Sequence, residues 1–356
     1  MKKITALLLM LILLVSLAGC GNDNSATTVE IEGCEVSLIT GVDGLSNEFI
    51  AETWECVEKY ANENELGSEY FISEKDTRES YLATIEKAVN EGAKLVILAG
   101  SDFEITTYEA QSKYKETKFL LIDGVPHSSK NNYETKANSI GVIFAEEEAG
   151  YLAGYAAVKD GCSDVAFFGS EDIPSIKLYG YGLVQGVSAA AEEKSQKIQL
   201  KYEYAGATEA SDKVREKAAD MYKNGTEVIF VSGGSIISSV IEAAEEYNGK
   251  VIGSDVDRSG SSNVVITSAI KNVEVAIEDA IDGFADGKYL GGTAFNYAAK
   301  NKGIGLEIDN ANFVTFTSDE YDQILNKLKE GEIELKKDNE VKSIKSIKNE
   351  LITIKE

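Results

Sequence analysis

The chain has 356 residues, of which 43 % are hydrophobic, and its net charge is −25 at pH 7. This length allows one large or two ordinary domains, and this hydrophobic content indicates a folded protein rather than a disordered one. The acidity argues against a nucleic-acid partner, because nucleic-acid-binding surfaces need basic patches. The single histidine, His127, excludes a histidine-rich metal site. We interpret it as a solvated loop residue rather than a ligand contact.

The N-terminus resembles the signal of a bacterial lipoprotein. Met1-Lys2-Lys3 is basic, residues 4–19 are almost wholly apolar, and small residues precede Cys20. An apolar run this short fits a secretory signal, since a membrane span needs about 20 residues. The resemblance implies removal of residues 1–19 and lipidation of Cys20, which anchors the protein to the cell membrane, facing outside the cytoplasm. An ordinary signal with a chance cysteine is the alternative. The polar residues 20–33 are predicted to be a tether.

The motifs of common enzymes, cofactor sites and metal sites are missing from the sequence. There is no dinucleotide fingerprint, phosphate loop or nucleophile elbow. Cys34, Cys56 and Cys162 form no C-x-x-C pair, so we expect no metal site. Buried free thiols are the preferred interpretation, and one disulfide with one thiol left over is the alternative. The sequence therefore predicts a protein that is not an enzyme and has no cofactor.

The rest of the chain alternates strands and helices in two successive sets. Hydrophobic periodicity predicts the strands at 35–40, 70–72, 94–98, 119–122, 164–168, 198–204, 227–231, 250–253, 264–267 and 312–316. It predicts helices ending near 62 and spanning about 81–89, 104–116, 146–159, 179–193, 210–224, 236–247, 272–286 and 319–330. Small residues recur along 146–159, and they predict close packing of that helix in a soluble protein. Apolar strands alternating with helices indicate two lobes, each a parallel sheet covered on both faces.

Residues 331–356 look like an addition to this pattern. Ile344, Ile347, Leu351 and Ile354 recur at helical spacing among lysines. This Lys-rich tail has three possible roles: packing on the body, contact with anionic lipid, or binding a partner. Packing or loose order is the preferred interpretation.

Polar residues at the ends of the predicted strands mark a ligand site. Ligands of open α/β sheets bind outside the carboxyl ends of the strands. Asp255 ends one strand, and a carboxylate there can accept two hydrogen bonds from the vicinal diol of a ribose. Lys271, placed by the pattern at the start of the next helix, is expected to pair with Asp255 across a cleft. A plain hinge salt bridge is the alternative.

Four stretches of the sequence resemble the basic membrane protein (BMP) family, the substrate-binding lipoproteins of ABC importers best known for purine nucleosides. They are residues 146–155, 179–186, 251–257 and 267–271. The resemblance implies a type I periplasmic-binding-protein fold, with two Rossmann-like parallel-sheet lobes joined by a three-crossover hinge. It also implies the boundaries: lobe 1 at 34–142 plus 264–300, lobe 2 at 143–263, and a C-terminal strand and helix at 301–330.

The resemblance also implies a set of ligand-binding residues. The family uses residues at the positions of Asp255 and Lys271 to hold the ribose, one at Asp123 to read the base edge, and a glycine pair at Gly233 and Gly234. Three positions depart from the family pattern: Ile50 replaces an Asn, Thr40 an Asp, and Thr208 a second aromatic residue. The full set of expected ligand-binding residues is Thr40, Asp43, Phe49, Asp123, Thr208, Gly233, Gly234, Asp255 and Lys271.

The sugar side of the expected site is thus kept, while the base side is altered. Loss of one stacking ring weakens binding, because base stacking contributes about 1–3 kcal/mol. The sequence predicts capture of a nucleoside or related ribosyl ligand, delivered to an ABC permease. The alternatives are a non-nucleoside solute, a membrane-tethered sensor or adhesion protein, and, with least support, a surface nucleoside hydrolase.

Overall fold

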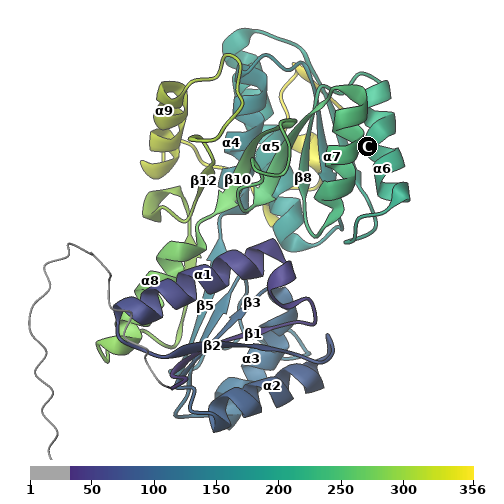
Figure 1. The fold of residues 1–356 in the computed structure, drawn as a ribbon. Coiled ribbons are helices and arrows are strands. Elements are labelled where there is room, and N and C mark those ends of the chain that lie inside the picture. The colour runs from purple at the N-terminus through teal and green to yellow at the C-terminus, as the bar shows by residue number, and fades with distance from the viewer. Residues whose placement is uncertain (1–32) are drawn as a thin grey trace, which may run out of the picture. The chain divides into compact units, whose positions relative to one another are not determined.

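The computed structural model describes residues 33–356. The predicted signal, Cys20 and most of the predicted tether lie outside the described residues. Glu32–Glu356 forms one compact unit, and its strands are divided between two sheets (Figure 1). Each sheet with its helices forms one lobe, as the two successive sets of strands and helices predict.

The sheet of lobe 1 has six strands that are all parallel. Its strand order is β11 (Thr293–Tyr297), β5 (Ser139–Phe144), β4 (Lys118–Ile122), β3 (Leu95–Ala99), β1 (Val36–Thr40) and β2 (Ser68–Ile72). Its helices are α1 (Glu48–Glu63), α2 (Arg78–Asn90), α3 (Glu104–Lys113) and α8 (Val273–Ala285). One face packs on α1 and α8 and the other on α2 and α3, so the inner strands are buried on both faces.

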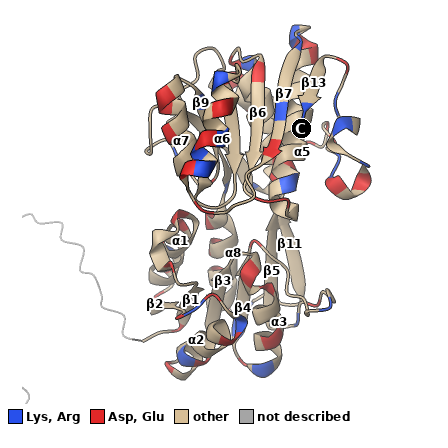
Figure 2. Cartoon of the chain, turned by 90° about the vertical axis from the view of Figure 1, so that its right-hand side faces the viewer, with Lys and Arg blue, Asp and Glu red and all other residues tan. Residues whose placement is uncertain are grey.

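The sheet of lobe 2 has seven strands, and only β12 is antiparallel. Its order is β12 (Ile304–Leu306), β10 (Val265–Lys271), β9 (Lys250–Asp255), β8 (Val228–Ser232), β6 (Asp164–Gly169), β7 (Ile198–Tyr204) and β13 (Ile352–Lys355). Its helices are α4 (Glu146–Lys159), α5 (Pro174–Lys194), α6 (Asp212–Lys223), α7 (Ile236–Tyr247) and α9 (Ser318–Lys329). Charged residues colour helices such as α6 and α7 of lobe 2 and α2 and α3 of lobe 1, as well as several loops (Figure 2).

The chain passes between the two sheets three times. It crosses from β5 to α4, from β10 to α8, and from β11 through the short helix η3 (Ala299–Asn301) to β12. The crossings are bonded to one another: the N–H of Ala145 donates to Tyr297 O, and that of Asn272 donates to Gly303 O, both at 2.9 Å. This confirms two parallel-sheet lobes joined by a three-crossover hinge.

One boundary differs from the expected one. The resemblance places residues 264–300 in lobe 1, but β10 pairs with β9 in the sheet of lobe 2. The second crossing therefore comes after Lys271. Only α8 and β11 from that stretch belong to lobe 1.

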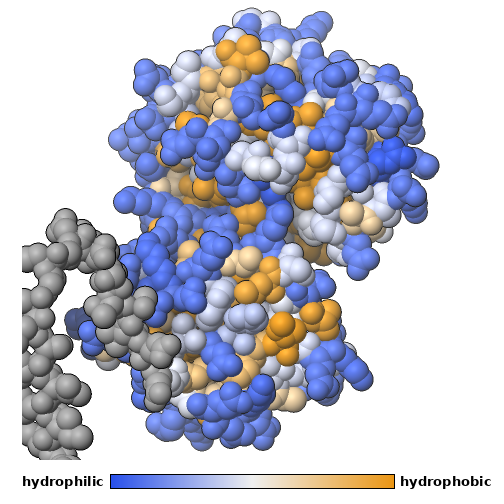
Figure 3. All heavy atoms as spheres, viewed as in Figure 1, coloured by the Kyte–Doolittle hydropathy of each residue, from blue (hydrophilic) through white to orange (hydrophobic). Residues whose placement is uncertain are grey.

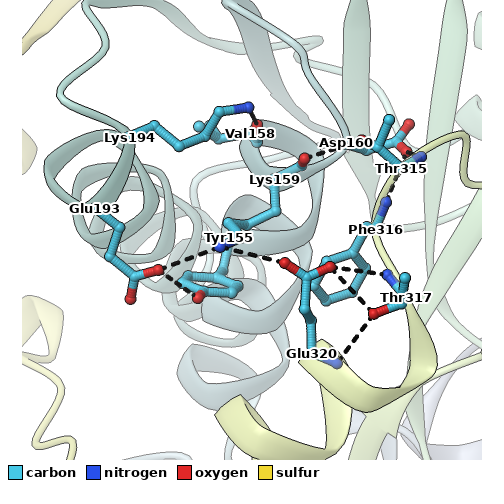
Figure 4. Close-up of polar contacts among 10 residues, drawn as sticks. All are labelled: Tyr155, Val158, Lys159, Asp160, Glu193, Lys194, Thr315, Phe316, Thr317 and Glu320. Carbon is cyan, nitrogen blue, oxygen red and sulfur yellow. Dashed lines mark hydrogen bonds and ion pairs between the residues drawn. The ribbon is translucent and has the colours of Figure 1, made fainter.

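The predicted strand at 312–316 is wrong. Its backbone curls around a buried carboxylate instead of pairing with another strand (Figure 4). Oδ1 of Asp160 accepts hydrogen bonds from the N–H groups of Val314, Thr315 and Phe316 at 2.6, 2.7 and 3.3 Å. Its Oδ2 accepts one from Lys250 at 3.0 Å. The apolar run that predicted a strand reflects burial of Phe316 beside α4 rather than sheet pairing.

Replacing Asp160 with asparagine is expected to lower the free energy of unfolding by about 1.5–3 kcal/mol, because charge-assisted hydrogen bonds are lost in a buried site. Burial alone raises the pKa of Asp160, but the backbone N–H groups and Lys250 outweigh it and hold that pKa below its usual value. The stabilisation is therefore present above the ordinary pKa of Asp and lost as the pH falls through the lower folded-state value. Urea unfolding at pH 7 and pH 3 tests this, with Asp220→Asn, from the exposed pair Asp220–Lys223, as control. An equal loss at both pH values would contradict it.

The tail packs on lobe 2, but its predicted helical stripe is wrong. Ile344 begins the short helix η5 (Ile344–Ser346), and β13 pairs in parallel with β7. The tail is bonded to α5 as well: Nε2 of Gln185 donates to Lys336 O at 2.9 Å, and Nδ2 of Asn349 donates to Ser188 O at 2.8 Å. The preferred interpretation of packing on the body is therefore confirmed.

Glycines let α4 and α5 approach each other closely. A Cβ atom at Gly150 would meet the carbonyl group of Tyr179, and one at Gly186 would meet that of Tyr151. Gly154 and Gly182 meet the facing helix backbone in the same way. This confirms the close helix packing predicted from the small residues of 146–159.

The remaining sequence interpretations have mixed outcomes. Cys34, Cys56 and Cys162 are free, and two of them are buried. His127 is not a solvated residue: its side chain is 12 % exposed, and its Nε2 lies 3.1 Å from Glu104. Within residues 33–356 no cluster of acidic, histidine or cysteine residues is arranged to hold a metal ion, and no helix is long and apolar enough to cross a membrane.

Candidate functional site

A cavity of about 460 Å³ lies between the lobes, at the carboxyl ends of strands from both sheets. Figure 3 shows hydrophobic residues among polar ones at the surface where the lobes meet. Seven of the residues expected to bind ligand line this cavity: Phe49, Asp123, Thr208, Gly233, Gly234, Asp255 and Lys271. The structure therefore brings together residues up to 222 positions apart in the chain, from Phe49 to Lys271.

Two of the expected residues do not line the cavity. Thr40 is fully buried in lobe 1, and its hydroxyl donates to Gly41 O and Phe71 O. Asp43 precedes the short helix η1 (Gly44–Ser46), and its carbonyl oxygen accepts a hydrogen bond from the Ser46 hydroxyl. The Thr40 side chain at the end of β1 therefore points into lobe 1. Its place at a strand end in the sequence did not reveal this direction.

A buried lysine, Lys271, lines the cavity. Nζ of Lys271 lies 2.9 Å from both carboxylate oxygens of Asp123, 3.2 Å from Oε1 of Glu146 and 3.3 Å from Oδ1 of Asp255. The predicted contact of Asp255 with Lys271 is thus present, but it does not cross the cleft, because the two residues end the neighbouring strands β9 and β10. The partner of Lys271 from the other lobe is Asp123. The predicted position at a helix start is wrong, because Lys271 ends β10 and α8 begins at Val273.

The charges of this cluster perturb one another. Burial alone would lower the pKa of Lys271, but Asp123, Asp255 and Glu146 together raise it well above its usual value. Lys271 therefore stays protonated. Burial is also the main reason that the pKa of Glu146 rises to about 8; Lys271 opposes this rise and Asp123 adds to it.

Asp123 and Asp255 both have a backbone conformation that is rare for residues with side chains. The φ angles are 60° for Asp123 and 71° for Asp255. Such left-handed residues cost free energy and persist where the surrounding structure holds them, often at functional sites. Here the conformation turns each carboxylate from its strand end toward Lys271.

Asp255 has two further partners that fix its carboxylate. The hydroxyl of Tyr179 donates to Oδ1 at 3.2 Å, and that of Ser254 donates to Oδ2 at 2.9 Å. Tyr179 is fully buried, and its ring centre lies 5.7 Å from Nζ of Lys271. The sequence analysis did not assign Tyr179 to the site. Its only signal was its place at the start of the stretch 179–186.

Glycines shape the side of the cavity formed by lobe 2. Gly233 and Gly234 follow β8 with φ angles of 96° and 61°. A Cβ atom at Gly234 would collide with the carbonyl group of Thr208, so only glycine lets this loop lie against the segment after β7. The fully buried Ser170 also lines the cavity here, and its hydroxyl has no protein partner.

An ion pair spans the cavity between the lobes. Glu48, the first residue of α1, pairs with Arg258, which follows β9. Both residues line the cavity, and the Arg258 side chain is 14 % exposed. The sequence analysis missed both residues, because neither stands in a recognisable pattern.

The groups that line the cavity can together bind a ligand with adjacent hydroxyl groups. The carboxylates accept hydrogen bonds, Lys271 donates them, and Phe49 offers an apolar surface.

Comparison with known proteins identifies the family. The model of a family described as "Bmp: ABC transporter substrate-binding protein PnrA-like" matches residues 42–339. The chain belongs to this family. It is a substrate-binding protein of the ABC transporter type, and therefore a binding protein rather than an enzyme. Bmp proteins work outside the cytoplasm in association with the membrane.

Curated relatives match over most of their length. The chain is 28 % identical over 319 residues to the "ABC transporter nucleoside-binding protein BmpA" of Lactococcus lactis subsp. cremoris, covering 83 % of this chain and 88 % of that protein. It is 27 % identical over 307 residues to "Basic membrane protein A" of Borreliella afzelii, covering 84 % of this chain and 90 % of that protein.

Solved structures share the fold. A solute-binding protein of an ABC transporter system from Conexibacter woesei superposes with a TM-score of 0.69 at 19 % identity, covering 86 % of this chain and 99 % of that chain. One from Aeropyrum pernix K1 has a TM-score of 0.66 at 19 % identity, covering 84 % of this chain and 87 % of that chain. These structures have the same two-lobe architecture. This Bmp protein therefore has a periplasmic-binding-protein fold.

Proposed function

We propose that this chain captures a nucleoside or related ribosyl ligand between its lobes and delivers it to an ABC permease. The observation that carries the proposal is the convergence of Asp123 and Asp255 on the buried Lys271. Two carboxylates and one ammonium can bind the two adjacent hydroxyls of a ribose through charge-assisted hydrogen bonds. The name of the Lactococcus relative, a nucleoside-binding protein, favours the same ligand class.

The base of the ligand would lie against Phe49, which lines the cavity on the lobe 1 side. On the lobe 2 side the lining includes Thr208, Ile173 and Ile237, and its aromatic residue, Tyr179, is bonded to Asp255. Contact with aliphatic side chains stabilises a base less than stacking does, so we expect weak preference among bases. Lipidation at Cys20 would hold the protein at the membrane beside its permease.

A thermal-shift screen of the purified full-length protein tests the proposal. We expect adenosine, guanosine, inosine or uridine to raise the melting temperature, because a ligand that binds only the folded state stabilises it by about 2.7 kcal/mol at a hundredfold excess over Kd. Ribose alone and unrelated sugars serve as comparison ligands.

The variant Asp255→Ala is expected to lose the shift. Asp257→Ala is the matched control, because Asp257 lies two residues away and bonds only to Ser259 among the contacts that the structure gives it. It should keep the shift. No shift with any nucleoside, together with a shift for another small solute, would refute the nucleoside proposal and leave a receptor for that solute.

A further inference from the structure

Glu146 stands at the first crossing of the hinge and contacts the ligand-site lysine. It is the first residue of α4, two positions after β5 ends. It opens a run of three glutamates, and only Glu146 among them reaches Lys271. The other two bond away from the cavity: Glu147 to Lys337 at 2.6 Å, and Glu148 to the N–H of Ala299 at 2.7 Å.

The surroundings of Glu146 contain more negative than positive charge. Its side chain is 5 % exposed and that of Lys271 is 3 % exposed. Asp123 and Asp255 face the same ammonium group from the ends of β4 and β9. The cluster thus has three carboxyl groups around one cation. The other titratable groups facing it are Tyr179 from α5, Glu147 on its own helix and Lys337 from the tail.

We propose that Glu146 is a positioning residue that holds Lys271 between the two aspartates while keeping its own proton, so that ligand binding weakens when Glu146 ionises. The ligand part of this inference rests on the proposed function. Within residues 33–356, Glu146 makes the ion pair that ties the first crossing of the hinge to Lys271, the residue at the second crossing. The ring of Phe144, also at the first crossing, lies 5.8 Å from the Lys271 ammonium.

The charge balance explains why Glu146 keeps its proton. Burial, with a contribution from Asp123, raises its pKa to about 8 even though Lys271 opposes the rise. A protonated Glu146 leaves Lys271 paired with Asp123 and Asp255. An ionised Glu146 competes for the same ammonium and adds a third negative charge to a buried site, which is costly.

Ligand binding further favours the protonated form of Glu146. The side chains of Asp123 and Asp255 are 22 % and 24 % exposed, and a ligand that covers them removes water that screens the cluster. The bound state therefore holds the Glu146 proton more firmly than the free state. Binding then takes up a proton above about pH 8, and affinity falls by up to tenfold per pH unit.

Other carboxyl groups also have raised pKa values, among them Glu148, whose pKa is raised mainly by burial. Burial, with Glu55 and Asp257, raises the pKa of Glu52 on α1 to about 7. Its titration lies below that of Glu146, so the range above pH 8 reports mainly on Glu146. A variant that changes Glu146 alone separates the two.

The first test measures Kd for adenosine, which is uncharged across this range, from pH 7 to pH 9.5. The wild-type Kd should stay constant to about pH 8 and then rise toward tenfold per unit. Glu146→Gln keeps the shape of the side chain without the ionisation, so its Kd should be flat. Glu148→Gln, two residues along the same helix, should keep the wild-type profile. If the Kd of Glu146→Gln rises with pH as much as that of wild type, the proposal is overturned.

The second test needs no ligand. The raised pKa means that the folded state holds a proton that the unfolded chain releases between about pH 4.5 and pH 8. The folding equilibrium constant of wild type should therefore fall relative to that of Glu146→Gln across this range, by up to tenfold per pH unit. If the unfolding free energies of wild type and Glu146→Gln change with pH in the same way, the inference that Glu146 is protonated is refuted. Failure of adenosine to bind wild type would instead count against the proposed function, and the unfolding profiles would still decide on Glu146.

Discussion

Replacing Lys271 with methionine is expected to destabilise the protein by about 3–5 kcal/mol at pH 8. Methionine has nearly the same length and shape, but it leaves three carboxyl groups together with no cation in a buried site. Removing one partner of a buried ion pair has this large cost because the remaining charge loses its compensation. Asp123 and Asp255 both lie within 3.3 Å of Lys271 and lose their cation together, whereas Glu146, with its pKa of about 8, is only partly ionised at this pH.

The loss of stability in Lys271→Met should become smaller as the pH falls. Lys271 opposes the rise in the pKa of Glu146, so without it this pKa increases further and the fold binds a proton that the unfolded chain does not. The stability of the variant therefore increases toward acid pH. Urea unfolding at pH 8 and pH 5.5 measures the difference.

Lys59→Met is the matched control for this experiment. Lys59 pairs with Glu274 at 2.6 Å, but both side chains are largely exposed. Exposed ion pairs are screened by water and salt, so this variant should unfold like wild type at both pH values. A Lys271→Met variant that also unfolds like wild type would mean that the three carboxyl groups do not depend on the lysine.

The strand ends of the site were predictable from sequence because local signals marked them. Asp123 and Asp255 each follow a run of apolar residues, and parallel strands bring such ends to one edge. Which of the neighbouring polar groups would face the cavity was not predictable. Thr40 also ends a buried strand, yet its side chain turns into lobe 1. Residues such as Glu146 and Arg258 reach the site through tertiary contacts that no spacing encodes.

The errors in the fold have a similar cause. The run at 312–316 is apolar like a strand, but the carboxylate of Asp160, more than 150 residues earlier, takes its N–H groups. The helical spacing of Ile344 and Ile354 is real, but pairing with β7 overrides it and makes β13. The pattern correctly marked the burial of Phe316 and Ile344, although Val314 in the first run is exposed. It failed where a distant partner decided the hydrogen bonds.

Gly186→Ala is expected to lower the free energy of unfolding by about 3 kcal/mol. The added methyl group would lie on the carbonyl group of Tyr151 in α4, 2.8 Å from its carbon and 2.9 Å from the N–H nitrogen of Tyr155. Overpacking usually costs about 1–3 kcal/mol when side chains can move aside. Here the neighbours are backbone atoms of a helix, which cannot rotate away, so the two helices must separate.

The matched control is Gly283→Ala in α8. A Cβ atom there would lie no closer than 3.6 Å to its neighbours, and alanine favours helix over glycine by up to about 1 kcal/mol. This variant should therefore be as stable as wild type or more stable. Equal stability of the two alanine variants in urea would show that α4 and α5 can adjust to the added methyl group.

Separation of α4 and α5 in Gly186→Ala would also change the ligand site. α4 begins with Glu146, and α5 contributes Tyr179, whose carbonyl group faces Gly150 across the helix contact. Moving the helices apart shifts Glu146 relative to Lys271 and Tyr179 relative to Asp255. We therefore expect Gly186→Ala to weaken adenosine binding even at temperatures where it is fully folded, whereas Gly283→Ala should bind as wild type does. Unchanged binding by folded Gly186→Ala would mean that the hinge cluster is positioned by the strands alone.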